Sequence, residues 1–296
     1  PLGKDLVDVI FVGMVIGLFT QALTTKEKIF ERSPINTISL ILVMFTFVSL
    51  IQGSIYLGRF SLLSISDPRV QAWKNYCMLP LLYVITLNTV KDKKWVWITV
   101  FVMCLTILFM DHYMVRQIQW FHSIESRTKI KGTFVYLGPN EVAAFYNQYT
   151  LILMSLFLAM KRGWKKLALM GIIFMNLYSI LFLFSRAAYA AMAIGMFFLF
   201  LIRKKILLVP LVIVAIAWHA FLPEQVQERI EMTTGDYGEL DVSSERRIMA
   251  WQDSLDLFFE SPIVGVGFGV FRHMGFDLGD THNIYLKILA EQGLVG

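Results

Sequence analysis

Three basic side chains, Arg186, Arg247 and His282, lie at the edges of apolar or amphipathic segments, where a charge is costly and therefore informative. A guanidinium group offers paired, planar donors to anionic oxygens, and an imidazole exchanges a proton near neutral pH. These side-chain types can stabilise a negative charge and accept a proton from a substrate. Each also has a structural explanation, because arginines anchor helices at membrane surfaces and a lone histidine usually packs or caps.

Helical geometry places the adjacent residues Arg246 and Arg247 on different faces of a predicted helix. The stretch after Ser243 and Ser244, which are candidate N-caps, is amphipathic as far as Glu260. Because residues three or four apart share a helix face, we expect Arg247 to point inward and Arg246 toward solvent. The predicted apolar face comprises Arg247, Trp251, Leu255 and Phe258, and the predicted polar face comprises Arg246, Ala250, Asp253 and Glu260.

A last helix is expected to begin near Asn283, with Thr281 as its cap. His282 would then share a face with Tyr285. The other four histidines show no pairing at metal-ligand spacing, and the sequence contains no Asp-x-Asp metal motif. The run 265–269 is glycine-rich but lacks the Lys-Ser/Thr of a nucleotide loop, so we expect a flexible, tightly turning connection.

The composition is that of an integral membrane protein. Of the 296 residues, 56% are hydrophobic and only 17% are charged, with a mean hydropathy of +0.61. These values exclude a disordered chain, a coiled coil and an ordinary soluble enzyme. The net charge of +5 would suggest nucleic acid in a soluble protein, but the basic residues lie between apolar runs and indicate membrane anchors. Cys77 and Cys104 both lie in apolar stretches and indicate no disulfide framework.

The apolar runs predict an all-α, polytopic membrane bundle over residues 1–222, because a spanning helix needs about 20 mostly apolar residues. A long extracytoplasmic loop with short amphipathic helices should follow at 223–282, and residues 283–296 should start a further membrane helix, truncated at Gly296. The eight predicted spans are 6–23, 35–57, 73–90, 94–112, 142–160, 165–184, 187–202 and 206–222.

Positive charge predicts the orientation of these spans. Thirteen basic residues occupy four short connections, whereas the alternate connections hold seven over about twice the length. The dense set should face the cytoplasm, which leaves Arg186, the 223–282 loop and His282 on the outer side. The dense connections are 24–34, 91–94, 161–166 and 203–205, and the alternate ones are 58–72, 111–141 and 185–186.

Several runs in the C-terminal part resemble the signatures of the O-antigen ligase and O-antigen polymerase family. Thr281–Leu286 followed by Ala290–Gly296 is similar to its "HN-x-hydrophobic-L … E-x-G" signature. Arg247 to Trp251 and then Ser261–Gly267 are similar to its "R-x-x-x-W … P-hydrophobic-hydrophobic-G-x-G" run. Ser185-Arg186 and the 132–140 segment resemble two further elements. The order and spacing of these elements make the combination fairly specific, and the first 130 residues match only in hydropathy.

The resemblance implies a membrane-embedded glycosyltransferase without a metal or other cofactor. It would take a glycan from undecaprenyl diphosphate and transfer it to a hydroxyl on lipid A–core, as a ligase, or on another lipid-linked glycan, as a polymerase. Its site would lie on the periplasmic side of the bacterial inner membrane, with membrane lipids and no nucleic acid as further partners. The catalytic residues would be His282, Arg247 and Arg186, and the substrate-binding residues would be Arg246, Asn283, Asn140 and Tyr285.

A second hypothesis is a flippase for lipid-linked oligosaccharides, or another transporter. Transporters usually show inverted repeats and charges near the bilayer centre. This sequence shows no internal repeat, and its candidate charges fall at one predicted surface. We therefore favour the enzyme, and the sequence leaves the choice between ligase and polymerase open.

The predicted orientation can be tested with single cysteines at positions 64, 185 and 240, in a chain whose two native cysteines are replaced. All three should react with a membrane-impermeant thiol reagent added to intact spheroplasts, because the charge asymmetry places them outside. Protection of all three would invert the topology and remove Arg186 and His282 from the periplasmic side.

Overall fold

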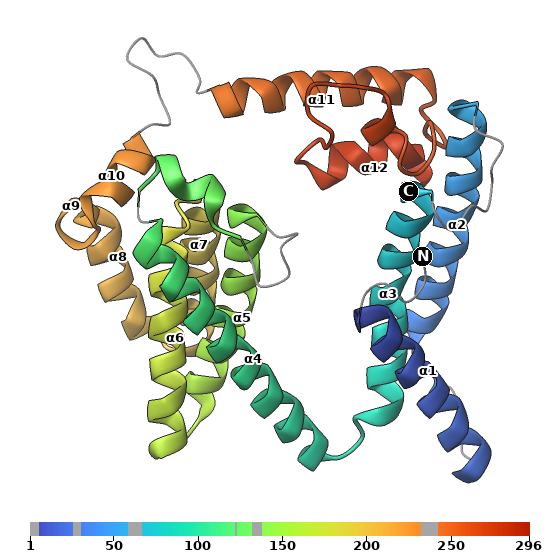
Figure 1. The fold of residues 1–296 in the computed structure, drawn as a ribbon. Helices are drawn as coiled ribbons and strands as arrows, with labels where there is room; N and C mark the ends of the chain where they lie inside the picture. Colours follow the sequence, from blue (N-terminus) through green and yellow to red (C-terminus); the bar gives the residue numbers. More distant parts are fainter. Residues whose placement is uncertain (1–5, 26–30, 59–66, 122, 132–137, 232–241) are drawn as a thin grey trace. The chain divides into compact units, whose positions relative to one another are not determined.

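The computed structural model describes residues 6–25, 31–58, 67–121, 123–131, 138–231 and 242–296, and over these residues it is helical, without strands (Figure 1). This confirms the predicted all-α class. Five helices of the described part are long and apolar enough to cross a membrane. They are α2 (Pro34–Tyr56), α4 (Lys93–Trp120), α5 (Pro139–Ala159), α6 (Trp164–Phe182) and α7 (Arg186–Arg203).

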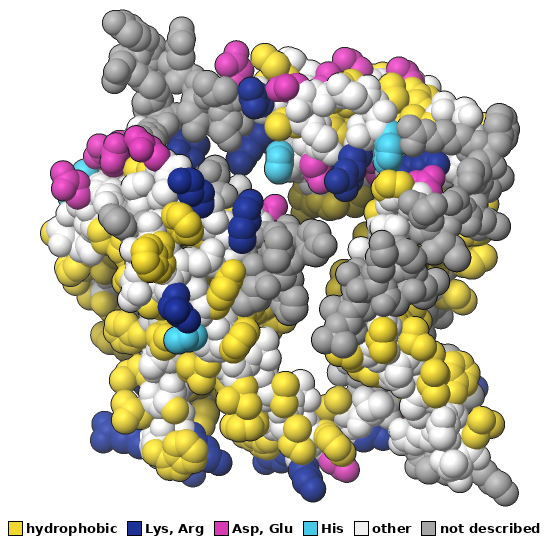
Figure 2. Space-filling view, viewed as in Figure 1, with side chains coloured by type: hydrophobic (Ala, Val, Ile, Leu, Met, Phe, Trp, Pro, Cys, Tyr) yellow, Lys and Arg dark blue, Asp and Glu magenta, His cyan; other side chains and the backbone are white. Residues whose placement is uncertain are grey.

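The flanks of these helices are apolar where a soluble protein would be polar. Phe101 on α4, Phe174 on α6 and Ile194 on α7 are 63%, 68% and 58% exposed. Figure 2 shows the same pattern, with hydrophobic side chains along the helices and Lys and Arg side chains gathered at their ends. Exposed apolar side chains with cationic ends fit helices that face lipid. The protein is therefore a multi-pass membrane protein.

Two of the predicted spans differ most from the observed helices. The predicted span 206–222 is not continuous, because it is divided into η2 (Lys205–Leu207), α8 (Leu208–Ile216) and α9 (Trp218–Phe221). Ala217 has φ −101° and ψ 32°, which interrupts the helix between α8 and α9. By contrast, α4 continues to Trp120, eight residues beyond its predicted end, because buried residues recur at helical spacing along it. These residues are Ile107, Met110, Met114 and Ile118.

The contacts divide the chain into two compact units. Unit 1 comprises residues 1–96 and 240–296, and unit 2 comprises residues 97–239. Unit 1 contains α1 (Leu6–Thr25), α2, α3 (Pro68–Thr89), α11 (Val242–Glu260), η3 (Phe271–His273), α12 (Ile284–Gln292) and η4 (Gly293–Val295). Unit 2 contains most of α4, η1 (Glu125–Lys129), α5 to α9 and α10 (Glu224–Glu231). The sequence pattern did not indicate that the first helices and the last segment belong to one unit.

Unit 2 holds a polar cluster that the sequence analysis did not identify. Asp111, Thr150, Asn176 and Ser179 come from α4, α5 and α6, and all four are fully buried. The Ser179 hydroxyl donates to Asp111 at 3.4 Å. Turning the Asn176 amide lets its nitrogen donate to both Asp111 oxygens at 3.0–3.1 Å while its oxygen accepts from Thr150. Polar groups inside a bundle are stable when they satisfy one another, so this cluster joins three helices.

The core of unit 1 forms around the glycine-rich run that follows α11. The amide groups of Val266 and Gly267 donate to the carbonyls of Ala290 and Glu291 at 3.0 and 2.8 Å, and Phe268 N donates to Ser49 O at 2.9 Å. The run therefore turns tightly, as predicted, but hydrogen bonds hold it between α12 and α2. The expectation of a flexible connection does not account for these bonds. Val266 of the run belongs to a buried cluster with Ala250, Leu257, Val270, Phe271 and Ala290.

Gly267 meets α2 so closely that no side chain fits. Its φ is 116°, and a Cβ there would overlap the backbone of Gly53. Gly275 has a positive φ of 79° as well, but a Cβ there would meet nothing within 4 Å.

Gly267→Ala should therefore destabilise the protein more than Gly275→Ala. We expect a loss of about 1–2 kcal/mol for backbone strain in either variant, and a further loss of about 1–3 kcal/mol for the overlap at position 267. Thermal unfolding of both variants in detergent measures the difference. Equal unfolding temperatures would mean that the loop does not pack against α2 in this way.

Candidate functional site

The candidate site in unit 1 begins on α11, whose buried face is rotated from the predicted one. Ala250, Ser254 and Leu257 are at most 2% exposed, whereas Trp251 and Leu255 are both 37% exposed. Ala250 was predicted on the polar face and instead packs in the core. The prediction failed because it used hydrophobicity alone. Small residues such as Ala250 and Ser254 make the closest helix contacts, whatever their hydrophobicity.

The two adjacent arginines differ as predicted. Arg246 is exposed, and its Nε lies 3.4 Å from Asp277 Oδ2, which is exposed as well. Arg247 is half-buried. Within the described residues, the Arg247 guanidinium has no acidic partner. A half-buried cation without a counter-ion is electrostatically suited to an anionic ligand.

Trp251 connects Arg247 with the His282 segment. It lies one helical turn after Arg247, and its indole Nε1 donates to the Thr281 carbonyl at 3.0 Å. The Thr281 side chain is buried, and its hydroxyl accepts from Asn283 N at 3.2 Å and donates to Asn283 O at 2.8 Å. His282 lies between these two fixed residues. The helix α11 thus carries the cation and, through Trp251, holds the backbone that precedes the histidine.

His282 is held in an uncommon conformation and presented to the exterior. Its φ is 50°, in the left-handed region, and its side chain is exposed. Its N–H lies 3.4 Å from Asp280 Oδ1, and Lys287 Nζ lies 3.2 Å from Asp280 Oδ2. Burial opposes ionisation of Asp280, but Lys287 and the His282 segment hold its pKa below the usual value. Strained residues of this kind persist where the surroundings fix them, often at functional sites.

Asn283, and not Thr281, is the cap of α12. Its side-chain oxygen accepts from Tyr285 N at 3.1 Å and from Leu286 N at 3.4 Å. The Thr281 hydroxyl instead closes a short local turn around His282. The predicted cap, Thr281, therefore lies two residues before the observed one, and asparagine is itself a strong N-cap. Tyr285 is 78% exposed, in the first turn of a helix that ends at Gln292.

Two buried charged residues of unit 1 were missed. Glu291, the acidic residue of the resembling "E-x-G" run, is 2% exposed and accepts from Phe271 N at 3.2 Å. Burial raises its pKa, while hydrogen bonds from the 269–271 backbone oppose that shift. Arg69 is 1% exposed and pairs with Asp67 at 2.7 Å beside Gly269. Glu291 thus binds the backbone just after the glycine-rich run, and the Arg69 side chain lies against Gly269. Only the Asp-Pro-Arg order at the start of α3 hinted at the Arg69–Asp67 pair.

Arg186 and Asn140 belong to unit 2. Arg186 is the first residue of α7 and is half-buried, and Asn140 is the second residue of α5 and is exposed. Arg229 on α10 donates from Nε to the carbonyl of Phe184 at 3.2 Å, which brings a second arginine close to the start of α7. Arg229 was not among the predicted site residues, because the short polar stretch of α10 is typical of an ordinary loop segment. A shared site of Arg186 with His282 remains a prediction.

The described residues contain no group of three or more His, Cys, Asp or Glu side chains that could hold a metal ion.

Replacing His282 by glycine tests whether this residue serves structure. Glycine adopts a positive φ without strain, so His282→Gly should be at least as stable as the natural protein and about 1 kcal/mol more stable than His282→Ala. Thermal unfolding in detergent provides the comparison. A clear loss of stability in His282→Gly would show that the imidazole packs or caps, which is the structural explanation of this histidine.

The comparisons with known proteins agree with the sequence resemblance. Residues 150–296 match the family model described as O-antigen ligase, and this stretch contains α11, the glycine-rich run and α12. The comparisons found no match among curated proteins or solved structures. Over residues 150–296, the chain therefore belongs to the O-antigen ligase family.

Proposed function

We propose that the protein transfers a glycan from undecaprenyl diphosphate to an acceptor hydroxyl at the periplasmic face of the bacterial inner membrane. The O-antigen ligase family supports the reaction class, a ligase- or polymerase-type glycosyl transfer. The acceptor is a hydroxyl of lipid A–core or of another lipid-linked glycan. The single observation that carries the residue assignment is the half-buried Arg247, which has no acidic partner in the described part and is linked through Trp251 to the His282 segment.

The reaction needs one bond to form and one to break. The acceptor oxygen attacks the anomeric carbon of the donor sugar, and the bond from that carbon to the diphosphate oxygen breaks. The acceptor proton passes to the imidazole of His282, and the diphosphate leaves with the electron pair of the broken bond. Arg247, with Arg186 as a second cation, stabilises the negative charge that develops on the leaving group. Neither a metal nor a nucleotide is required.

The remaining predicted residues would bind the substrates. Tyr285, three residues after His282, offers an exposed ring, which suits the face of a sugar. Asn283 uses its side-chain oxygen for the helix cap, so its amide nitrogen is the group that can reach a ligand. Arg246 and Asn140 are exposed and would contact the glycan or the diphosphate from the edge of the site.

One observation favours the transporter hypothesis. Asp111 is an acidic residue buried within a helix long enough to cross the membrane, and such residues often mark transport pathways. However, Asn176 and Ser179 surround its carboxylate with hydrogen-bond donors, which is equally expected of a structural cluster. The family match supports the enzyme, so we retain transport as the second hypothesis.

The purified protein should transfer glycan from a synthetic undecaprenyl-diphosphate donor to its acceptor in the presence of EDTA. His282→Ala should lower the turnover by about 10²–10⁴-fold, the usual contribution of a positioned base, with donor affinity retained. His219→Ala, an exposed histidine of unit 2, is the matched control and should be active. Activity that vanishes with EDTA and returns with magnesium would exclude the proposed arginine clamp, and normal turnover in His282→Ala would exclude the base.

Arg247→Ala should abolish transfer, whereas Arg246→Ala should retain most of it, because only Arg247 is half-buried without an acidic partner. Arg247→Lys should also be poor, since an ammonium group cannot replace a paired donor fork. Turnover and unfolding temperature are measured for all three variants. Equal losses in Arg246→Ala and Arg247→Ala would mean that the register of α11 does not select the diphosphate ligand.

A further inference from the structure

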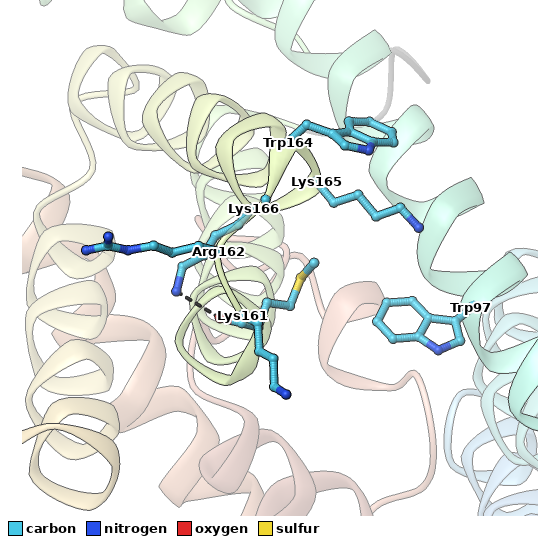
Figure 3. A pocket seen from close by; sticks show the side chains of 8 residues that line it. Trp97, Lys161, Arg162, Trp164, Lys165 and Lys166 are labelled. Atoms are coloured by element: carbon cyan, nitrogen blue, oxygen red, sulfur yellow. Dashed lines mark hydrogen bonds between the residues drawn. The ribbon is translucent and has the colours of Figure 1, made fainter.

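The turn between α5 and α6 forms a basic pocket within unit 2. Its volume is about 450 Å³, and it contains four cations and no acidic residue. Trp97 from α4 and Trp164 from α6 form part of its wall (Figure 3). The cations are Lys161, Arg162, Lys165 and Lys166. Four cations without an acidic lining residue create a positive potential that an anionic group would neutralise.

An apolar groove adjoins this pocket. It has a volume of about 310 Å³ and shares Trp97, Met160, Trp164 and Lys165 with the basic pocket. Along α4 it extends from Trp97 to Leu108, which is about 16 Å at 1.5 Å per residue. Half of a hydrocarbon core of about 30 Å is 15 Å. The groove is therefore as long as one leaflet's hydrocarbon layer.

The four cations are not equivalent. Lys166 Nζ donates to the Met160 carbonyl at 3.0 Å and lies 4.5 Å from the Phe157 ring, so it caps the end of α5. In Figure 3, Arg162 points away from Trp97, whereas Lys165 points toward the Trp97 side. Lys165 Nζ lies 5.8 Å from the Trp164 ring centre, and Lys161 is exposed on the same turn. Lys161 and Lys165 are therefore the cations best placed to meet a ligand in the pocket.

We propose that this pocket and groove bind one diacyl phospholipid with an anionic headgroup, such as phosphatidylglycerol. Lys161 and Lys165 would bind the phosphate, and Trp97 and Trp164 would lie at the level of the glycerol esters, where tryptophan is common. One acyl chain would occupy the groove between α4 and α6. A zwitterionic lipid carries an ammonium group that four cations repel, so the site distinguishes headgroups by net charge.

Native mass spectrometry of the detergent-purified protein tests the site, with phosphatidylglycerol and phosphatidylethanolamine of equal chain length as probes. The natural protein should retain one phosphatidylglycerol in preference to phosphatidylethanolamine. The double variant Lys161→Gln/Lys165→Gln should bind it at least about ten-fold more weakly. Lys204→Gln/Lys205→Gln removes the same charge from another basic connection and should bind within two-fold of the natural protein.

A third variant distinguishes lipid binding in this groove from diffuse electrostatic attraction of lipids to the basic turn. Ala168 is exposed and lines the groove, so Ala168→Trp fills it without disturbing the core or any cation. It should lose the retained lipid while its unfolding temperature stays unchanged. Equal weakening in both lysine double variants, normal binding in Ala168→Trp, or displacement of the lipid by undecaprenyl phosphate at equal concentration would each overturn the proposal.

Discussion

The close approach of the glycine-rich run to α2 is the constraint on which the rest of unit 1 depends. At Gly267 the backbone meets Gly53, and the amides on either side bond to α12 and to α2. The bonds to α2 connect residues that are more than 200 positions apart in the chain, as do the side-chain bonds of Ser49 and Gln52. With the run held in this way, α12 has a fixed position against α11, and the turn that carries His282 lies beside Trp251. A helix of nine residues is only marginally stable in isolation, so α12 by itself would not fix the position of that turn.

The same packing explains how the site can hold unfavourable features. A histidine at a φ of 50° and a half-buried arginine without an acidic partner in the described part each cost free energy. The bonds of Thr281 to Asn283 and Trp251, and the buried contacts of Ala250 and Leu257, offset that cost. Glu291 contributes as well, because its buried carboxylate accepts a hydrogen bond from the Phe271 backbone just after the glycine-rich run. The signature residues thus divide into those that would meet substrate and those that hold the loop.

The sequence predicted the helical class, five of the membrane helices and the different exposure of Arg246 and Arg247, because these follow from hydropathy and helical spacing. It did not predict Ala250 as a core residue, since close helix packing depends on small size. It also placed the cap at Thr281, because threonine and asparagine both cap helices and spacing does not choose between them. The cluster around Asp111 was not recognised, since single polar residues on three separate helices have no common pattern until they pack.

The membrane environment explains why the two units place their charges differently. In unit 2, Asp111 is enclosed and satisfied by neutral donors, so its free energy is lowered within the fold. The cations of the α5–α6 turn lie at a helix end, where lipid headgroups and water can solvate them. In unit 1, Arg247 has neither an enclosing network among the described residues nor full exposure. A cation in that state is solvated best by a ligand that brings its own negative charge, as the proposed lipid-linked diphosphate donor would.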